Sequence, residues 1–151
     1  MSDPLDLSNY LNANADGWVT HTGLRFTRAT RDEVVAELEV RPQHLQAYGI
    51  VHGGIYSGIV ETLASVGASV DAFHQGRLAV GLENHTSFLH AVRGGLLRAV
   101  GRPLSRGRRS QVWEVGIEDA TGRTVATGRV RLLCFDSESD PSGIKFRLPD
   151  G

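Results

Sequence analysis

Glu61 is the one charged residue in the segment from Gly53 to Val70, which reads GGIYSGIVETLASVGASV. Apolar residues recur there at helical spacing and form one stripe, made of Ile59, Leu63, Val66, Val70 and Phe73. Glu61 is turned about 200° away from this stripe on a helix of 3.6 residues per turn. A carboxylate isolated on a face without lysine or arginine is a candidate general base or nucleophile.

The residues predicted to share the face of Glu61 are small: Gly54, Ser57, Gly58, Ala64, Ser65 and Ala68. A solvated helix face normally carries several charges and ion pairs. The small residues therefore predict that another group approaches Glu61 closely. Two other interpretations stay open, because Glu61 could be solvated or paired with an arginine from another element. Ser65, one turn later, could hold Glu61 or a water, or serve only helix packing.

The tripeptide His52–Gly53–Gly54 stands at the predicted start of this helix. Glycine allows backbone N–H groups to approach a ligand, and a helix N-terminus attracts negative charge. An oxyanion that forms on a carbonyl group would be stabilised there. Two glycines can also simply make a tight turn, but the nearby lone acid favours a site.

Four arginines surround Gly107, namely Arg102, Arg106, Arg108 and Arg109. Such a cluster on a hairpin loop would bind a polyphosphate, since guanidinium groups form charge-assisted hydrogen bonds with phosphate oxygens. A charged, solvated turn is the alternative.

Composition excludes several other classes of function. The formal net charge of −1 gives no field that would hold nucleic acid or an anionic membrane. The single cysteine, Cys134, excludes an intramolecular disulfide and a cysteine-based zinc cluster. The histidines His44, His85 and His90 lack metal-ligand spacing, so no metal or other cofactor is expected. The first residues do not resemble a secretory signal, and we expect a cytoplasmic protein that does not span a membrane.

The positions of apolar and turn residues predict an α+β fold in which an antiparallel sheet surrounds one central helix. A short helix is expected over 5–15 and the long helix from Gly53 to about His74. Strands are expected over 23–29, 34–40, 78–91, 95–103, 111–118 and 123–135. The chain would consist of an N-terminal segment (1–20), one domain (21–136) and a C-terminal tail (137–151).

Three segments carry a resemblance to a known family: GIVHGGIYSGIVETLAS (49–65), VGLENHTSF (80–88) and GRRSQVWEVGIEDATGR (107–123). The chain resembles hotdog-fold acyl-CoA thioesterases of the phenylacetate-pathway type. Within that group it is similar to 4-hydroxybenzoyl-CoA and 1,4-dihydroxy-2-naphthoyl-CoA thioesterases. The resemblance implies a curved antiparallel sheet around one long helix, a homodimer or homotetramer, and hydrolysis of an acyl- or aryl-CoA ester.

The resemblance also assigns roles to individual residues. Glu61 falls on the catalytic carboxylate, and Gly53 on the residue whose N–H faces the thioester oxygen. Gln46 and His52 fall near that thioester, and Ser65 on a residue that reaches the reaction centre from the partner subunit. The residues expected to contact the rest of the substrate are Gly54, Asn84, His90, Arg108, Arg109 and Ser110. His90 departs from the family pattern, because relatives often have an arginine there.

Two other functions stay open. A hotdog dehydratase or hydratase would have its histidine in a loop well before the helix, whereas His52 directly precedes the helix glycines. A non-catalytic acyl-CoA binding protein would lack the acid, whereas Glu61 is present.

Overall fold

The computed structural model describes residues 5–15, 17–136 and 138, and it consists of one long helix against a six-stranded antiparallel sheet. The helices are α1 (Ser8–Ala13), α2 (Gly17–Thr22) and α3 (Gly53–Phe73), with a 3₁₀ turn η1 (Pro42–His44). The strands are β1 (Arg25–Ala29), β2 (Val34–Val40), β3 (Arg77–Phe88), β4 (Gly95–Arg106), β5 (Ser110–Glu118) and β6 (Thr124–Asp136). The predicted hotdog fold is confirmed.

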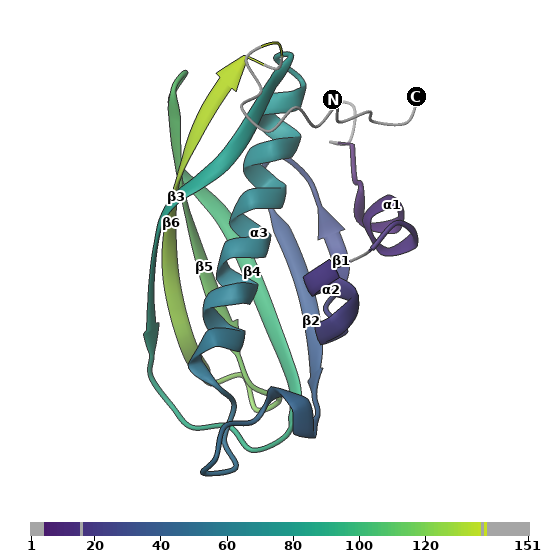
Figure 1. Cartoon of the computed structure of the whole chain (residues 1–151), viewed down its shortest axis with the longest axis vertical. Coiled ribbons are helices and arrows are strands. Elements are labelled where there is room, and N and C mark those ends of the chain that lie inside the picture. The colour runs from purple at the N-terminus through teal and green to yellow at the C-terminus, as the bar shows by residue number, and fades with distance from the viewer. Residues whose placement is uncertain (1–4, 16, 137, 139–151) are drawn as a thin grey trace.

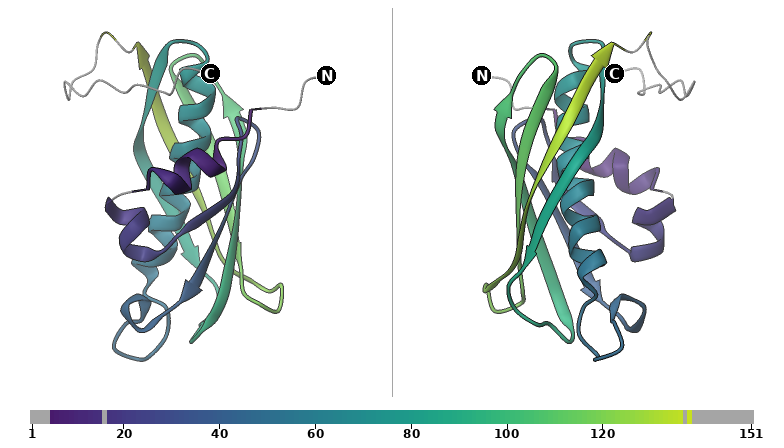
Figure 2. Two further views of the ribbon diagram at one scale, coloured as in Figure 1. Left: turned by 90° about the vertical axis from the view of Figure 1, so that its right-hand side faces the viewer. Right: turned by 60° about the vertical axis from the view of Figure 1, so that its left-hand side comes forward.

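The strands follow the order β1-β2-β4-β5-β6-β3, so that β3 lies at one edge of the sheet. Figure 1 shows α3 along one face of the sheet, and the side views in Figure 2 show the strands curving around it. β3 pairs with β6 from Arg77↔Asp136 to Phe88↔Ala126 and has a register shift between Gly81 and Glu83. Its other edge pairs with no strand in the described part of the chain.

The helix and the sheet meet around Trp113 of β5, whose side chain is fully buried. A side chain at Gly67 would overlap the Trp113 ring, so glycine at this position allows α3 to lie directly on the indole. The indole Nε1 donates to Gln111 Oε1 at 2.8 Å, and Gln111 Nε2 donates to Asp71 Oδ2 at 2.8 Å. Aromatic packing and hydrogen bonds together hold the C-terminal half of α3 on the sheet.

The curved sheet covers more of α3 than the predicted apolar stripe suggested. Ala64 and Ala68, which were assigned to the face of Glu61, are fully buried, whereas Phe73 of the stripe is 39% exposed. The assignment of these three residues was wrong because a strongly curved sheet buries a wider arc of a helix than one stripe. Glu61 itself is half-buried at the side of the helix next to β3.

The N-terminal segment differs from the single helix predicted over 5–15, because it forms α1 and the additional helix α2. Asn12 fixes α1 to β1, since its amide donates to Phe26 O at 2.7 Å and accepts from Phe26 N at 2.9 Å. Trp18 of α2 lies against Gly58 of α3, where a Cβ atom would overlap the indole. The expected tail lies outside the described residues except for Glu138, and the predicted domain boundaries stay predictions.

β3 and β4 differ most from the predicted strands at their C-terminal ends, while β1, β5 and β6 differ by one or two residues. β4 continues past Pro103 to Arg106, because a register shift between Pro103 and Ser105 accommodates a residue that lacks an N–H group. β3 ends at Phe88 instead of Ala91. No helix in the described ranges is long and apolar enough to cross a membrane.

Candidate active site

Glu61 projects from α3 toward the edge strand β3. Its carboxylate accepts hydrogen bonds from Ser65 Oγ at 3.3 Å and from Asn84 Nδ2 at 3.1 Å. Within the described residues it makes no ion pair. Among the residues that the structure describes, the carboxylate is therefore held by neutral donors and has no cationic partner.

Gly81 of β3 leaves the space that the Glu61 carboxylate occupies. A Cβ atom at this position would overlap Glu61 Oε1. The sequence analysis missed Gly81, and the alternation of residues along β3 does not reveal it, because the bulge between Gly81 and Glu83 interrupts that alternation. The bulge brings both Gly81 and Asn84 to the side of the strand that faces Glu61.

The N-terminus of α3 has one backbone donor that no other described residue uses. His52 is the N-cap, and its Nδ1 accepts the N–H of Gly54 at 2.8 Å. The N–H of Ile55 is bound by His52 O at 2.9 Å. Gly53 N–H is thus the donor left at this helix end, where the helix dipole also favours negative charge. Because its Nδ1 accepts, a neutral His52 ring has its proton on Nε2.

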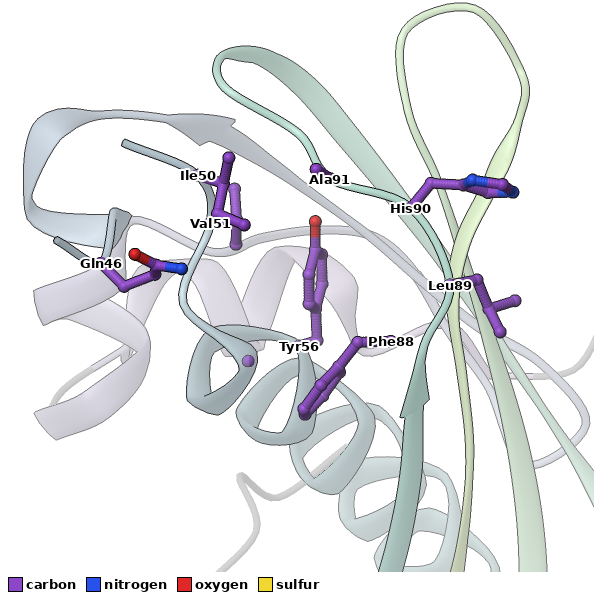
Figure 3. A pocket seen from close by; sticks show the side chains of 9 residues that line it. Gln46, Ile50, Val51, Tyr56, Phe88, Leu89, His90 and Ala91 are labelled. Carbon is purple, nitrogen blue, oxygen red and sulfur yellow. The ribbon is translucent and has the colours of Figure 1, made fainter. Parts of the chain in front are cut away.

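A cavity of about 290 Å³ opens beside this helix end. Figure 3 shows residues that line it, which are Gln46, Ile50, Val51, Gly53, Tyr56, Phe88, Leu89, His90 and Ala91. Three of the predicted site residues thus meet at one cavity: Gln46, Gly53 and His90. Glu61 is not among the lining residues and lies two turns further along α3.

The side chains around the cavity differ in how they face it. Gln46 Oε1 accepts the N–H of Tyr48, and its amide nitrogen points toward the other lining residues (Figure 3). The His90 ring points away from Gln46 and Tyr56 (Figure 3). The Tyr56 ring lies 6.0 Å from the Phe88 ring, centroid to centroid. Burial raises the pKa of Tyr56, whose hydroxyl finds no hydrogen-bond partner among the described residues.

The four arginines that the sequence brings together form two pairs with different surroundings. Arg102 and Arg106 belong to β4 and not to the predicted loop, and they bind Glu33 and Asp32 of the β1–β2 turn. The hydrogen bond from Arg106 lowers the pKa of Asp32. Arg108 and Arg109 lie in the exposed β4–β5 hairpin and make no ion pair within the described residues. Of the predicted cluster, Arg108 and Arg109 are thus the two arginines that no described acid neutralises.

The hairpin with Arg108 and Arg109 lies at the C-terminal end of α3, whereas Gly53 lies at its N-terminal end. Arg77, which follows α3, donates to the carbonyl of Arg108. The backbone of Arg109 accepts from Cys134 N at 2.8 Å. A helix of 21 residues is about 30 Å long, so Gly53 and the hairpin of one chain lie far apart.

The sequence of residues 48–126 matches the family described as the thioesterase superfamily. This range includes Gly53, Glu61, Asn84 and the arginine hairpin. The chain belongs to the thioesterase superfamily. Membership makes it an enzyme of the thioester hydrolase class, which confirms the predicted type of enzyme.

Similar proteins support this assignment along most of the chain. Rv1847 of Mycobacterium tuberculosis is 43% identical over 112 residues, which are 73% of this chain and 80% of that protein. The proofreading thioesterase EntH of Cronobacter turicensis is 37% identical over 121 residues, or 80% of this chain and 88% of EntH. The solved structure of thioesterase HI1161 from Haemophilus influenzae has a TM-score of 0.80 at 26% identity, and the match covers 89% of this chain and 93% of that one.

Neither a reactive cysteine nor a metal site is found among the residues that the structure describes. Burial raises the pKa of the Cys134 thiol, which makes Cys134 a poor nucleophile. Among the described residues, no three histidine, cysteine, aspartate or glutamate side chains lie together in a way that could hold a metal ion.

Ser110 begins β5 next to the arginine hairpin, and its carbonyl accepts the Gly107 N–H at 2.8 Å.

Proposed function

We propose that this thioesterase hydrolyses an acyl- or aryl-CoA thioester to the free acid and CoA, without a cofactor. One observation carries the proposal. Glu61, a half-buried carboxylate with no cationic partner in the described chain, stands on the same helix whose unused N–H, that of Gly53, lines a cavity. The resemblance to 4-hydroxybenzoyl-CoA and 1,4-dihydroxy-2-naphthoyl-CoA thioesterases gives the substrate class.

In this proposal the acyl group enters the cavity and its carbonyl oxygen accepts the Gly53 N–H. Gln46 donates a second hydrogen bond near the thioester, and His52, whose Nδ1 accepts the Gly54 N–H, fixes the helix end. Glu61 lies two turns from Gly53 on the same helix, so the base at this thioester would be Glu61 of the partner subunit. It removes a proton from water, whose oxygen attacks the thioester carbon. The C–S bond then breaks, and the CoA thiolate leaves and takes up the proton. In the alternative route, the Glu61 carboxylate attacks the thioester carbon, the C–S bond breaks and the CoA thiolate leaves. Water then opens the mixed anhydride, which releases the free acid and regenerates Glu61, and the thiolate takes up the remaining proton.

Release of free thiol tests the proposed reaction. A panel of aliphatic and aromatic CoA esters is incubated with the protein, and the free thiol is measured with a chromogenic disulfide. Thioester hydrolysis releases one thiol and one acid for each substrate consumed. A dehydratase or hydratase would change the acyl chain without releasing thiol, and an acyl-CoA binding protein would bind without turnover. Either result would refute the proposed reaction.

We further propose that Arg108 and Arg109 bind the phosphates of CoA. Replacing both with alanine is expected to raise KM for the best acyl-CoA by about tenfold or more, because charge-assisted hydrogen bonds to phosphate are lost. The effect on kcat should be smaller. The matched control replaces Arg102 and Arg106, whose charges are already neutralised by Glu33 and Asp32, and KM should then change little.

Acyl-pantetheine separates phosphate binding from general damage to the hairpin, because it lacks the nucleotide. Its KM should barely differ between the wild type and the Arg108/Arg109 variant. Added salt should weaken acyl-CoA binding by the wild type more than by the variant. If KM rises equally for both substrates, or for neither, the hairpin does not bind the CoA phosphates.

The separation of Gly53 from this hairpin supports a further part of the proposal, a homodimer through β3. β3 is an edge strand with the exposed apolar residues Val80 and Leu82, which are 45% and 53% exposed. Such an edge is a template for pairing with a second chain. Two β3 strands paired antiparallel would place the partner's hairpin beside the end of α3 where Gly53 lies. The tetramer expected from the resemblance would combine two such dimers.

A charge in the middle of β3 tests this interface. Leu82→Asp is expected to give monomers with little activity, because like charges from two copies would meet near a twofold axis. Light scattering at the assay concentration measures the mass, and thiol release measures activity. Leu5→Asp, at a leucine that is 58% exposed and lies outside the sheet, should leave both unchanged. A wild type that is active as a monomer would contradict the proposal.

A further inference from the structure

The amide of Asn84 is in contact with the carboxylate of Glu61 and with the backbone of the same helix. Asn84 Nδ2 donates to Glu61 Oε2 at 3.1 Å and to the carbonyl of Ser57 at 3.0 Å. Ser57 precedes Glu61 by about one turn, so one amide group holds both the carboxylate and the turn before it. The edge strand β3 is thereby tied to the Glu61 side chain.

Thr86, two residues further along β3, fixes the orientation of this amide. Its hydroxyl donates to Asn84 Oδ1 at 2.7 Å. A backbone carbonyl and a carboxylate can only accept hydrogen bonds, so the amide nitrogen must face Ser57 and Glu61 while the amide oxygen faces Thr86. Without the Thr86 hydroxyl, the amide oxygen of Asn84 would lose its hydrogen-bond donor, and the orientation of the amide group would be less fixed.

We propose that Asn84 is a positioning residue for Glu61, and that Thr86 positions Asn84. Asn84 thus acts on the reaction through the carboxylate, and not through the contact with the substrate that the sequence analysis expected of it. The hydrogen bonds of Asn84 and Ser65, together with the space left by Gly81, hold the carboxylate against β3, and no cation in the described part of the chain pairs with it. A carboxylate held in this way has one orientation. This inference rests on the proposed catalytic role of Glu61.

Steady-state kinetics on the full-length protein with the best thioester substrate test this proposal. Asn84→Ala is expected to lower kcat by about 10–100-fold, because a hydrogen bond to a charged group is lost, while KM stays within about twofold. Thr86→Val removes only the hydroxyl and should lower kcat by about 2–10-fold. Thr86→Ser keeps the hydroxyl and should restore kcat to within about twofold of the wild type. Thermal unfolding checks that each variant is folded.

The outcomes separate this inference from the proposed function on which it rests. Glu61→Gln is measured in parallel. If Glu61→Gln is inactive while a folded Asn84→Ala has wild-type kcat, the positioning role is refuted and the proposed function stands. If Glu61→Gln keeps wild-type kcat, the catalytic role of Glu61 fails first. A rise in KM at unchanged kcat in Asn84→Ala would show that Asn84 binds substrate. A Thr86→Ser variant as slow as Thr86→Val would refute the role of the Thr86 hydroxyl.

Discussion

Replacing Glu61 with glutamine is expected to lower kcat by about 10²–10⁴-fold, with little change in KM for the thioester substrate. Glutamine has the same size as glutamate; its amide oxygen can still accept the hydrogen bond from Asn84, and its NH₂ group can donate to the Ser65 hydroxyl. It cannot take a proton from water or form an anhydride, so both proposed routes fail. Free-thiol release at saturating substrate measures kcat, and titration with CoA checks that binding is retained.

Glu83 of β3 offers a matched control for this substitution. The Glu83 carboxylate is exposed and pairs with Arg131 at 3.2 Å. Glu83→Gln therefore removes a negative charge from β3, the strand beside Glu61, without changing Glu61 itself. This variant should keep the wild-type kcat within about twofold, because exposed ion pairs contribute little. A folded Glu61→Gln variant with near-wild-type kcat would falsify Glu61 as the catalytic group.

Much of the fold could be predicted from the sequence because the pattern of apolar residues changes period along the chain. Alternating apolar residues such as those of Val34–Val40 predicted strands, and the apolar stripe from Ile59 predicted the long helix. Glu61 could be found because it is the one charge in that helix before Asp71. Asp71 itself is buried and paired with Arg31 at 2.8 Å, which shows that a helical acid can also be structural.

Other parts of the site depend on contacts between distant segments, which local patterns do not show. Arg102 and Arg106 are neutralised by residues of a turn about 70 positions earlier in the chain, so the sequence cluster overstated the free positive charge. Phe88 and Tyr56 line the cavity only because the end of β3 lies beside the start of α3. The bulge at Gly81–Glu83 changes which residues of β3 face Glu61. The alternation of apolar and polar residues in the sequence does not reveal this bulge.

The backbone N–H of Gly53 can be tested although no side chain carries it. Gly53→Pro removes this donor and is expected to lower kcat by about 10²–10³-fold, the usual effect of losing one oxyanion donor. Proline is well tolerated at the first position of a helix. The preceding residue, His52, already has φ −66° and ψ 133°, which is the conformation that a following proline requires. The fold of α3 should therefore survive the substitution.

A side chain at position 53 also has a steric effect, which must be separated from the loss of the donor. A Cβ atom there would lie 2.5 Å from Cε2 of Phe88, so any substitution displaces the ring. Gly53→Ala keeps the N–H but has the same Cβ atom, and it is the matched control. Both variants are compared in a Phe88→Ala background, in which the clash is absent. If the folded proline and alanine variants have equal kcat, the Gly53 N–H does not stabilise the oxyanion, and catalysis depends on Glu61 without help from the helix N-terminus.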